Sequence, residues 1–153
     1  MQTRTEKGGK NSEGPIGTGL VIERRFTTIG EDPFDQFDWI EMDVEIRNAD
    51  GSLAHRIDDV RLPSGFSGVA GKVLAQKYLR KAGVPAILRK VKEKGVPTWL
   101  QRSEPDHEKL QSLDPEKRFI GESHGRELFR RLAGTWTYWG WKHGYFEAEA
   151  DAR

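Results

Sequence analysis

The sequence predicts an α+β fold made of a β-hairpin, an amphipathic helix and an aromatic-rich C-terminal helix. Three observations predict it. Apolar and charged residues alternate over residues 40–46, an apolar stripe of helical period begins at Gly71, and six aromatic side chains occur between residues 134 and 146. A polar tail precedes these elements, and a charged segment separates the two helices.

Composition limits the core of this 153-residue chain, since 35% of its residues are apolar and 32% are charged. The net charge of +1 gives no overall field toward nucleic acid or membrane. No apolar run could span a bilayer, and the first residues are too polar for a signal peptide. The chain has no cysteine, which fits a cytoplasmic location and excludes a thiolate nucleophile, a disulfide or a thiyl radical from this chain.

The first segment in chain order is a tail, residues 1–18. It is polar and rich in glycine, so we expect it to be disordered. The following stretch, GTGLVIERRF, lacks the glycine spacing of a phosphate-binding loop. We therefore assign no nucleotide site to it.

The β-hairpin is predicted next. The expected inward positions of its first strand are Ile40, Met42, Val44 and Ile46. The letters NADG then supply a turn, in which Gly51 can adopt a positive φ. The return strand begins at Leu53, and its alternation changes phase at Asp58 and Asp59, which predicts a bulge there.

The stretch GVAGKVLAQKYLRKAGVP, residues 68–85, predicts an amphipathic helix. Its expected buried face is Gly71, Leu74, Ala75, Tyr78 and Leu79. Its cations are Lys72, Lys77, Arg80 and Lys81. Ser67 is the candidate N-cap, Gly83 suits the position after the helix, and Pro85 prevents its continuation.

Residues 86–121 hold eight Lys or Arg, six Asp or Glu and three prolines, with weak periodicity. We interpret them as a charged inserted loop with short helical pieces. Ser123 is the candidate cap of a last helix, which begins near His124 within residues 122–153.

The aromatic run GTWTYWGWKHGYF forms two stripes if it is helical. One stripe contains Leu128, Leu132, Trp136, Trp139 and Phe146. The other contains Tyr138, Trp141 and Tyr145. A helix that is apolar on two sides is normally buried on both. Because the chain has little other apolar sequence, we predict that the first stripe faces its own core. The second is then exposed and docks onto another polypeptide.

Two groups of polar residues invite a catalytic or metal site. Seven carboxylates lie between residues 31 and 46, and the histidines are His55, His107, His124 and His143. The acidic segment has no histidine and no calcium-loop spacing, so turn chemistry and a solvated strand face explain it better. The histidines form no ligand or nucleophile motif. We predict no catalytic, cofactor-binding or metal-binding residue in this chain.

Three stretches carry a resemblance to a known family. They are GLVIERRFTTIGEDPFDQFDWIEMDVEIRNADGS, LAQKYLRKAGVP and RLAGTWTYWGWKHGYFEAEADA. In this order they closely resemble the N-terminal region of bacterial vitamin B12-dependent (class II) ribonucleotide reductases. The resemblance covers roughly residues 19–85 and 122–152 and leaves the tail and the charged segment unmatched.

The resemblance implies a part in making deoxyribonucleotides for DNA synthesis. In that family adenosylcobalamin generates a thiyl radical on a cysteine, further cysteines supply electrons and a thioredoxin-like donor restores them, all within an α/β barrel. This chain has neither the cysteines nor the DxHxxG cobalamin signature. It is therefore expected to bind no cofactor, to be inactive alone and to be an incomplete N-terminal piece of the barrel enzyme.

The expected domains are a disordered tail (1–18), the reductase N-terminal domain (19–85), a charged insert (86–121) and a helix leading toward the barrel (122–153). The expected partner is the remainder of the reductase, as a second chain or a continuation. Two alternatives stay open. One is a nucleic-acid or nucleotide-binding module that uses the basic helix and exposed aromatics. The other is an independent interaction protein derived from this region.

Overall fold

The computed structural model describes residues 19–66 and 68–153. The predicted tail at residues 1–18 and the predicted N-cap Ser67 lie outside the described residues. The elements in chain order are η1 (Pro33–Gln36), β1 (Trp39–Arg47), β2 (Leu53–Pro63), α1 (Gly68–Tyr78), β3 (Val84–Pro85), β4 (Leu88–Lys90), β5 (Ser103–Pro105), α2 (His107–Gln111), η2 (Pro115–Lys117), β6 (Phe119–Ile120), α3 (Gly125–Lys142) and α4 (Glu149–Ala152).

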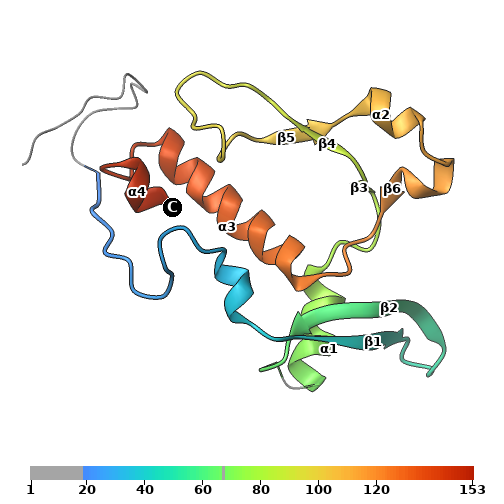
Figure 1. Cartoon of the computed structure of the whole chain (residues 1–153). Helices are drawn as coiled ribbons and strands as arrows, with labels where there is room; N and C mark the ends of the chain where they lie inside the picture. Colours follow the sequence, from blue (N-terminus) through green and yellow to red (C-terminus); the bar gives the residue numbers. More distant parts are fainter. Residues whose placement is uncertain (1–18, 67) are drawn as a thin grey trace, which may run out of the picture.

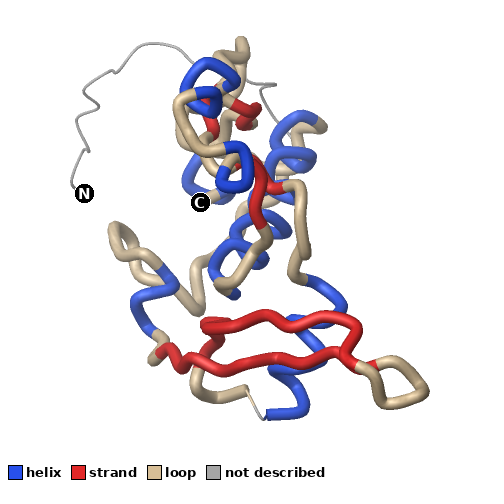
Figure 2. The backbone as a smooth tube through the Cα atoms, turned by 90° about the vertical axis from the view of Figure 1, so that its right-hand side faces the viewer, coloured by secondary structure: helices blue, strands red, loops and turns tan. Residues whose placement is uncertain are grey.

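The architecture is a small α+β arrangement around one long helix. Helix α3 begins at the β1–β2 hairpin, which carries α1, and the segment with β3 to β6 lies along its other side (Figures 1 and 2). Within the described residues there are three two-stranded antiparallel sheets, which pair β1 with β2, β3 with β6 and β4 with β5. The predicted hairpin and both principal helices are therefore present.

The hairpin contains the predicted bulge. Met42 pairs with Val60 and Val44 pairs with Ile57, so Asp43 faces two residues, Asp58 and Asp59. Asp59 has a φ of 54°, a left-handed backbone conformation that accommodates the extra residue of the bulge. Gly51 has a φ of 83° in the turn, as its position in NADG predicts.

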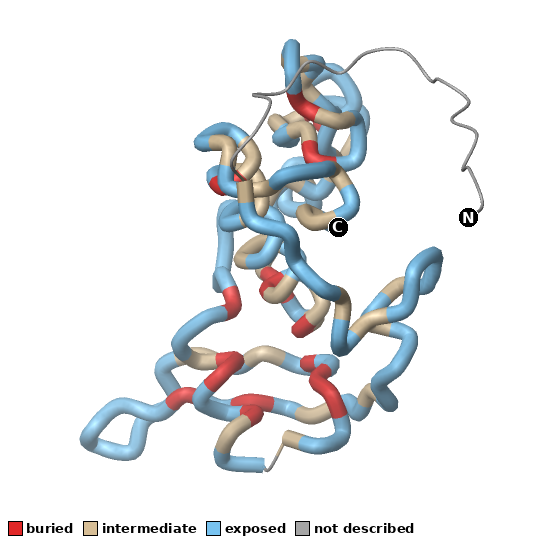
Figure 3. Tube along the Cα trace, turned by 90° about the vertical axis from the view of Figure 1, so that its left-hand side faces the viewer, coloured by how far each residue is buried: buried red, intermediate tan, exposed pale blue. Residues whose placement is uncertain are grey.

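The core lies between the hairpin, α1 and the first turns of α3 (Figure 3). Its buried residues are Val44, Val60, Leu62, Leu74, Ala75, Leu79 and Leu128. Ile46 is also buried and Met42 is half-buried, as the alternation predicts. The prediction for Ile40 is wrong, because this side chain is 41% exposed near the start of β1, although its cross-strand partner Leu62 is buried.

Helix α1 is shorter than predicted and buries Gly71, Leu74 and Ala75, while Leu79 is buried just beyond its end. The prediction for Tyr78 is wrong, since its side chain is 57% exposed. Helix α1 ends at Tyr78, and the backbone then turns toward residue 122. Gly83 has the left-handed φ of 78°, but it precedes β3 and does not terminate the helix.

Residues 86–121 form short elements. They contain β4, β5, α2, η2 and β6, and β6 pairs with β3, which lies directly before this segment. Asp106 caps α2 by accepting a hydrogen bond from the Lys109 N–H at 3.2 Å. The side chains of Val96, Leu100 and Leu110 are buried. The segment therefore folds against itself and against α3, and this changes which aromatic side chains are covered.

Both ends of α3 follow known capping patterns. His124, and not the predicted Ser123, is the N-cap: its Nδ1 accepts from the Arg126 N–H at 3.1 Å, and the Glu127 carboxylate accepts from the His124 N–H at 3.2 Å. The C-terminal end forms a Schellman motif. Tyr145 N–H donates to the Gly140 carbonyl, and Gly144 has a φ of 68°.

The two ends of the described chain lie together. The Leu20 N–H donates to the Tyr145 carbonyl at 2.7 Å, and the Glu147 N–H donates to the Leu20 carbonyl at 3.2 Å. A Cβ at Gly19 would lie 2.3 Å from the backbone of Phe146, so only glycine fits there. Leu20 thus forms an isolated parallel bridge with Phe146, which follows α3.

Candidate docking site

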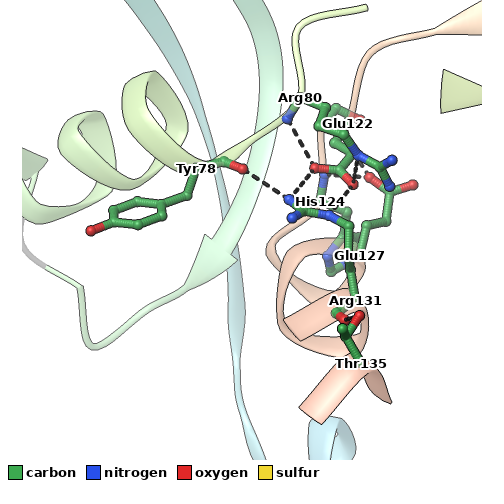
Figure 4. A network of polar contacts seen from close by, with 8 residues as sticks. Tyr78, Arg80, Glu122, His124, Glu127, Arg131 and Thr135 are labelled. Atoms are coloured by element: carbon green, nitrogen blue, oxygen red, sulfur yellow. Dashed lines mark hydrogen bonds and ion pairs between the residues drawn. The ribbon is translucent and has the colours of Figure 1, made fainter. Parts of the chain in front are cut away.

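A buried carboxylate connects the end of α1 with the first half of α3. Glu122 is 3% exposed and lies between the end of α1 and the first half of α3. Its carboxylate accepts hydrogen bonds from the Arg80 N–H at 2.9 Å, from Arg80 Nε at 2.9 Å and from two nitrogens of Arg131 at 3.0 and 2.9 Å (Figure 4). Arg131 also donates to the Tyr78 carbonyl at 2.9 Å.

The charge state of Glu122 follows from these contacts. Burial raises the pKa of the Glu122 carboxyl, but the hydrogen bonds from Arg131 and Arg80 outweigh burial and hold the pKa below its usual value. Glu122 is therefore ionised at neutral pH, and its charge is compensated by two guanidinium groups. A carboxylate paired in this way stabilises the junction and is a poor candidate for a general acid or base.

An aromatic and cationic cluster lies at the N-terminus of α3. The rings of Trp39 and His124 meet edge to face at 4.4 Å, and the guanidinium of Arg126 lies 5.2 Å from the centre of the Phe34 ring. Burial lowers the pKa of His124, and the nearby Arg126 lowers it further. The neutral imidazole is thereby favoured, and only the neutral form can accept the capping hydrogen bond.

This cluster borders an open depression of about 540 Å³. Its lining residues are Trp39, Glu41, Arg61, His124 and Arg126. Their charges are largely paired within the protein, since Arg61 contacts Glu41 and Arg126 contacts Asp35. His124 Nδ1 accepts a hydrogen bond from the Arg126 N–H, so this nitrogen is used in capping α3.

The acidic segment is used in turns and ion pairs. Asp32 accepts from the Phe34 N–H at 3.0 Å and from Arg130 at 2.6 Å. Asp43 contacts Arg56 at 2.8 Å across the hairpin. Within the part of the chain that the structure describes, no three histidine or carboxylate side chains come together as a metal ion would require. The seven carboxylates are spread over η1, β1 and the residues next to them.

The four histidines lie in different elements and make different contacts. His124 is the N-cap of α3, and His55 is half-buried on β2. His107 begins α2, and His143 follows α3, where its ring lies 6.1 Å from that of Tyr145. Of the predicted basic face of the first helix, Lys72, Lys77 and Lys81 are exposed, but Arg80 is directed to Glu122.

The tryptophans and Tyr138 on α3 are covered in the opposite way to the prediction. Trp136 is 63% exposed and Trp139 is 57% exposed, whereas Tyr138 and Trp141 are half-buried. The covering element is the segment after β4. The Tyr138 hydroxyl donates to Glu93 at 2.7 Å, and Trp141 Nε1 donates to the Gly95 carbonyl at 2.6 Å. The prediction therefore fails because residues 86–121 fold back on α3.

The remaining two residues of the stripes also differ from each other. Tyr145 is 62% exposed, as predicted for the second stripe. Phe146 lies beyond the end of α3 and is half-buried, with its ring against Gly140. The exposed tryptophans Trp136 and Trp139, which we name the indole face, are therefore the candidate docking site on this helix.

Few features of the sequence predict the contacts of Glu122. Glu122 was one acidic residue among 24, and its partners lie 42 and 9 residues away. The local sequence shows only that Glu122 is a charged residue directly before the predicted helix cap.

Among the residues that the structure describes, no helix has the length and apolar character needed to cross a membrane.

The fold and the site define a small α+β unit that presents an aromatic surface. Comparison with known proteins then identifies its family. A sequence model of the class II vitamin B12-dependent ribonucleotide reductase matches residues 41–153. The chain belongs to the class II vitamin B12-dependent ribonucleotide reductase family and corresponds to its N-terminal region.

Individual relatives agree with this. The vitamin B12-dependent ribonucleotide reductase of Bradyrhizobium diazoefficiens is 51% identical over 134 residues, which are 88% of this chain and 11% of the relative. That of Agrobacterium fabrum is 49% identical over 133 residues, 87% of this chain and 10% of the relative. That of Streptomyces avermitilis is 34% identical over 101 residues, 63% of this chain and 10% of the relative.

The matches cover most of this chain but little of its relatives. The chain spans about a tenth of the length of the curated relatives it matches. The family match also runs across residues 86–121, which the initial resemblance left out. Nothing in the comparisons supports the alternative of a nucleic-acid or nucleotide-binding module.

Proposed function

We propose that this chain is the N-terminal, non-catalytic part of a vitamin B12-dependent ribonucleotide reductase, and that it packs against the remainder of the enzyme. The observation that carries the proposal is the family match over a tenth of the relatives' length by a chain without cysteine. Thiyl-radical chemistry needs a cysteine, so it belongs to a region outside this chain.

The proposal assigns a role to each part of the enzyme. The hairpin, α1 and α3 form a rigid unit around the Glu122 network, and this unit supports the catalytic barrel. Adenosylcobalamin serves the complete enzyme and is held by residues outside this chain. The electron donor is a thioredoxin-like protein, which implies a reducing compartment, and the proposed location is therefore the cytoplasm. The product is a deoxyribonucleotide for DNA synthesis.

The domain boundaries belong to the same proposal. Residues 19–85 form the reductase N-terminal domain, residues 86–121 form a charged segment that covers one side of α3, and residues 122–153 lead toward the barrel. The contacts of Glu93 with Tyr138 and Lys142, at 2.7 and 2.5 Å, join the second part to the third, and the contact of Arg80 with Glu122 joins the first part to the third.

A chimaeric enzyme tests the proposal. In the chimaera, this chain replaces the matching region of the Bradyrhizobium reductase. The comparison protein is the same reductase with that region deleted. The expected result is that the chimaera forms deoxyribonucleotides at a rate within about tenfold of the parent enzyme, a difference of roughly 1.4 kcal/mol in activation free energy. The deleted protein should be much slower. Equal rates of the chimaera and the deleted protein would show that this region does not contribute to the enzyme.

A further inference from the structure

The indole face continues a stripe that the protein uses for its core. Leu128 is 2% exposed, and Leu132 packs against the core cluster one turn later. Trp136 and Trp139 follow on the same side of α3 at the spacing of successive helical turns. One apolar stripe is therefore buried over its first half and exposed over its second half.

The stripe becomes exposed because the elements that bury its first half do not extend along the whole of α3. The hairpin contacts the start of α3, where Gly125 lies against Leu62. Neither the hairpin nor α1 reaches the second half of the helix (Figure 1). The segment after β4 lies on another side, where it contacts Tyr138 and Trp141. Two large apolar side chains, each more than half exposed on one helix face, are typical of an interaction surface.

The chemistry of the face favours an apolar polypeptide as its occupant. The exposed lysines of α1 belong to a different helix, and the nearest cation on α3, Lys142, contacts Glu93 at 2.5 Å. Aromatic stacking with a nucleic acid would normally combine rings with unpaired cations. The indole face instead has the composition of the buried centre of a protein interface, in which tryptophan is enriched and charge is depleted.

The length of the relatives indicates which polypeptide occupies the indole face. About nine tenths of each relative's length lies outside the region that this chain matches. Helix α4 packs beside the second half of α3, so a polypeptide continuing from residue 153 would start next to this helix (Figure 1). We propose that Trp136 and Trp139 bind an apolar segment of the reductase polypeptide that lies downstream of the matched region. This inference rests on the proposed function.

Photo-crosslinking in the full-length chimaera tests the inference. p-Benzoylphenylalanine is placed at position 136 or 139, and at position 69 as the control. Val69 is 74% exposed on α1 and is distant from the indole face. Mixing isotope-labelled and unlabelled enzyme distinguishes crosslinks within one polypeptide from crosslinks between copies. We expect positions 136 and 139 to crosslink within one polypeptide to a downstream segment, at least tenfold more than position 69.

Other outcomes have definite meanings. Crosslinks between labelled and unlabelled copies would assign the indole face to a second copy of the enzyme and overturn the inference. Crosslinking at position 136 or 139 no stronger than at position 69 would also overturn it. In either case an active chimaera leaves the proposed function standing, whereas an inactive chimaera beside an active parent enzyme contradicts the proposed function itself.

Discussion

At the scale of single residues, Glu122 joins the end of α1 to the first half of α3. Its carboxylate is 2% exposed, while the side chains of Arg80 and Arg131 are 50% and 29% exposed. The acid is therefore desolvated, and its partners are only partly so. Because the folded pKa of Glu122 is lowered, its contribution is present above its ordinary pKa of 4.5 and is lost as pH falls through the lowered value.

Replacing Glu122 by glutamine tests this role. Glu122→Gln keeps the size of the side chain but leaves Arg80 and Arg131 without a counter-charge, so we expect a loss of about 2–3 kcal/mol in the free energy of unfolding. Urea denaturation of the purified chain measures it. The control is Asp114→Asn, which breaks the exposed pair with Lys117 and should cost less than about 1 kcal/mol. Equal losses in the two variants would refute a special role for Glu122.

His124 makes the N-terminus of α3 sensitive to pH. Burial and nearby Arg126 lower its folded pKa below the ordinary value of 6.5, while Glu127 acts in the opposite direction and Arg61 and Arg130 add to the lowering. The unfolded chain therefore takes up the proton first. The stability that the neutral imidazole contributes is complete above pH 6.5 and is lost as pH falls through the folded pKa.

The variant His124→Asn isolates this effect. Asparagine is a good N-cap and does not titrate, so the variant should keep the helix end and lose the pH dependence. The measurement is the urea midpoint at about pH 7.5 and at about pH 5.5, a window above the titration of most carboxyl groups. We expect the midpoint of the unmodified chain to fall further than that of the variant. Parallel changes would rule out His124 as the source.

At the scale of elements, local features were predicted from the sequence, whereas the covering of α3 was not. The bulge at Asp58 and Asp59 and the positive φ of Gly51 were predicted because both depend on neighbouring residues. The half-burial of Tyr138 and Trp141 was not predicted, because it depends on the distant segment that contains Glu93 and Gly95. A helical wheel identifies two stripes but cannot tell which of them another segment covers.

Hydrogen exchange checks the corrected arrangement. Trp141→Ser removes the donor to the Gly95 carbonyl and the ring beside it, so residues 91–100 should open and exchange faster. Trp136→Ser changes a side chain that is 63% exposed and should leave exchange in residues 91–100 as it was, with less than about 1 kcal/mol lost in unfolding free energy. Faster exchange of this segment in the Trp136 variant alone would contradict the structure.

At the scale of the whole molecule, the fold class and the family were predictable, and the candidate site was not. The hairpin and both helices have local patterns, and the sequence stretches around them carry the resemblance that the family match confirms. The Glu122 network and the covering of Tyr138 depend on contacts between residues 42 and 45 positions apart, which leave no periodic signal. The exposed indole face follows only from the complete packing.

The central claim is that this chain contributes by binding the rest of the reductase, and complementation in trans measures it most directly. Purified chain is added in increasing amounts to the Bradyrhizobium enzyme that lacks the matching region, after circular dichroism has shown that enzyme to be folded. We predict that deoxyribonucleotide formation rises and saturates, and that the Trp136→Ser/Trp139→Ser chain needs at least about tenfold higher concentrations, as expected for two central interface tryptophans. An unchanged rate at every concentration of the unmodified chain would contradict the claim.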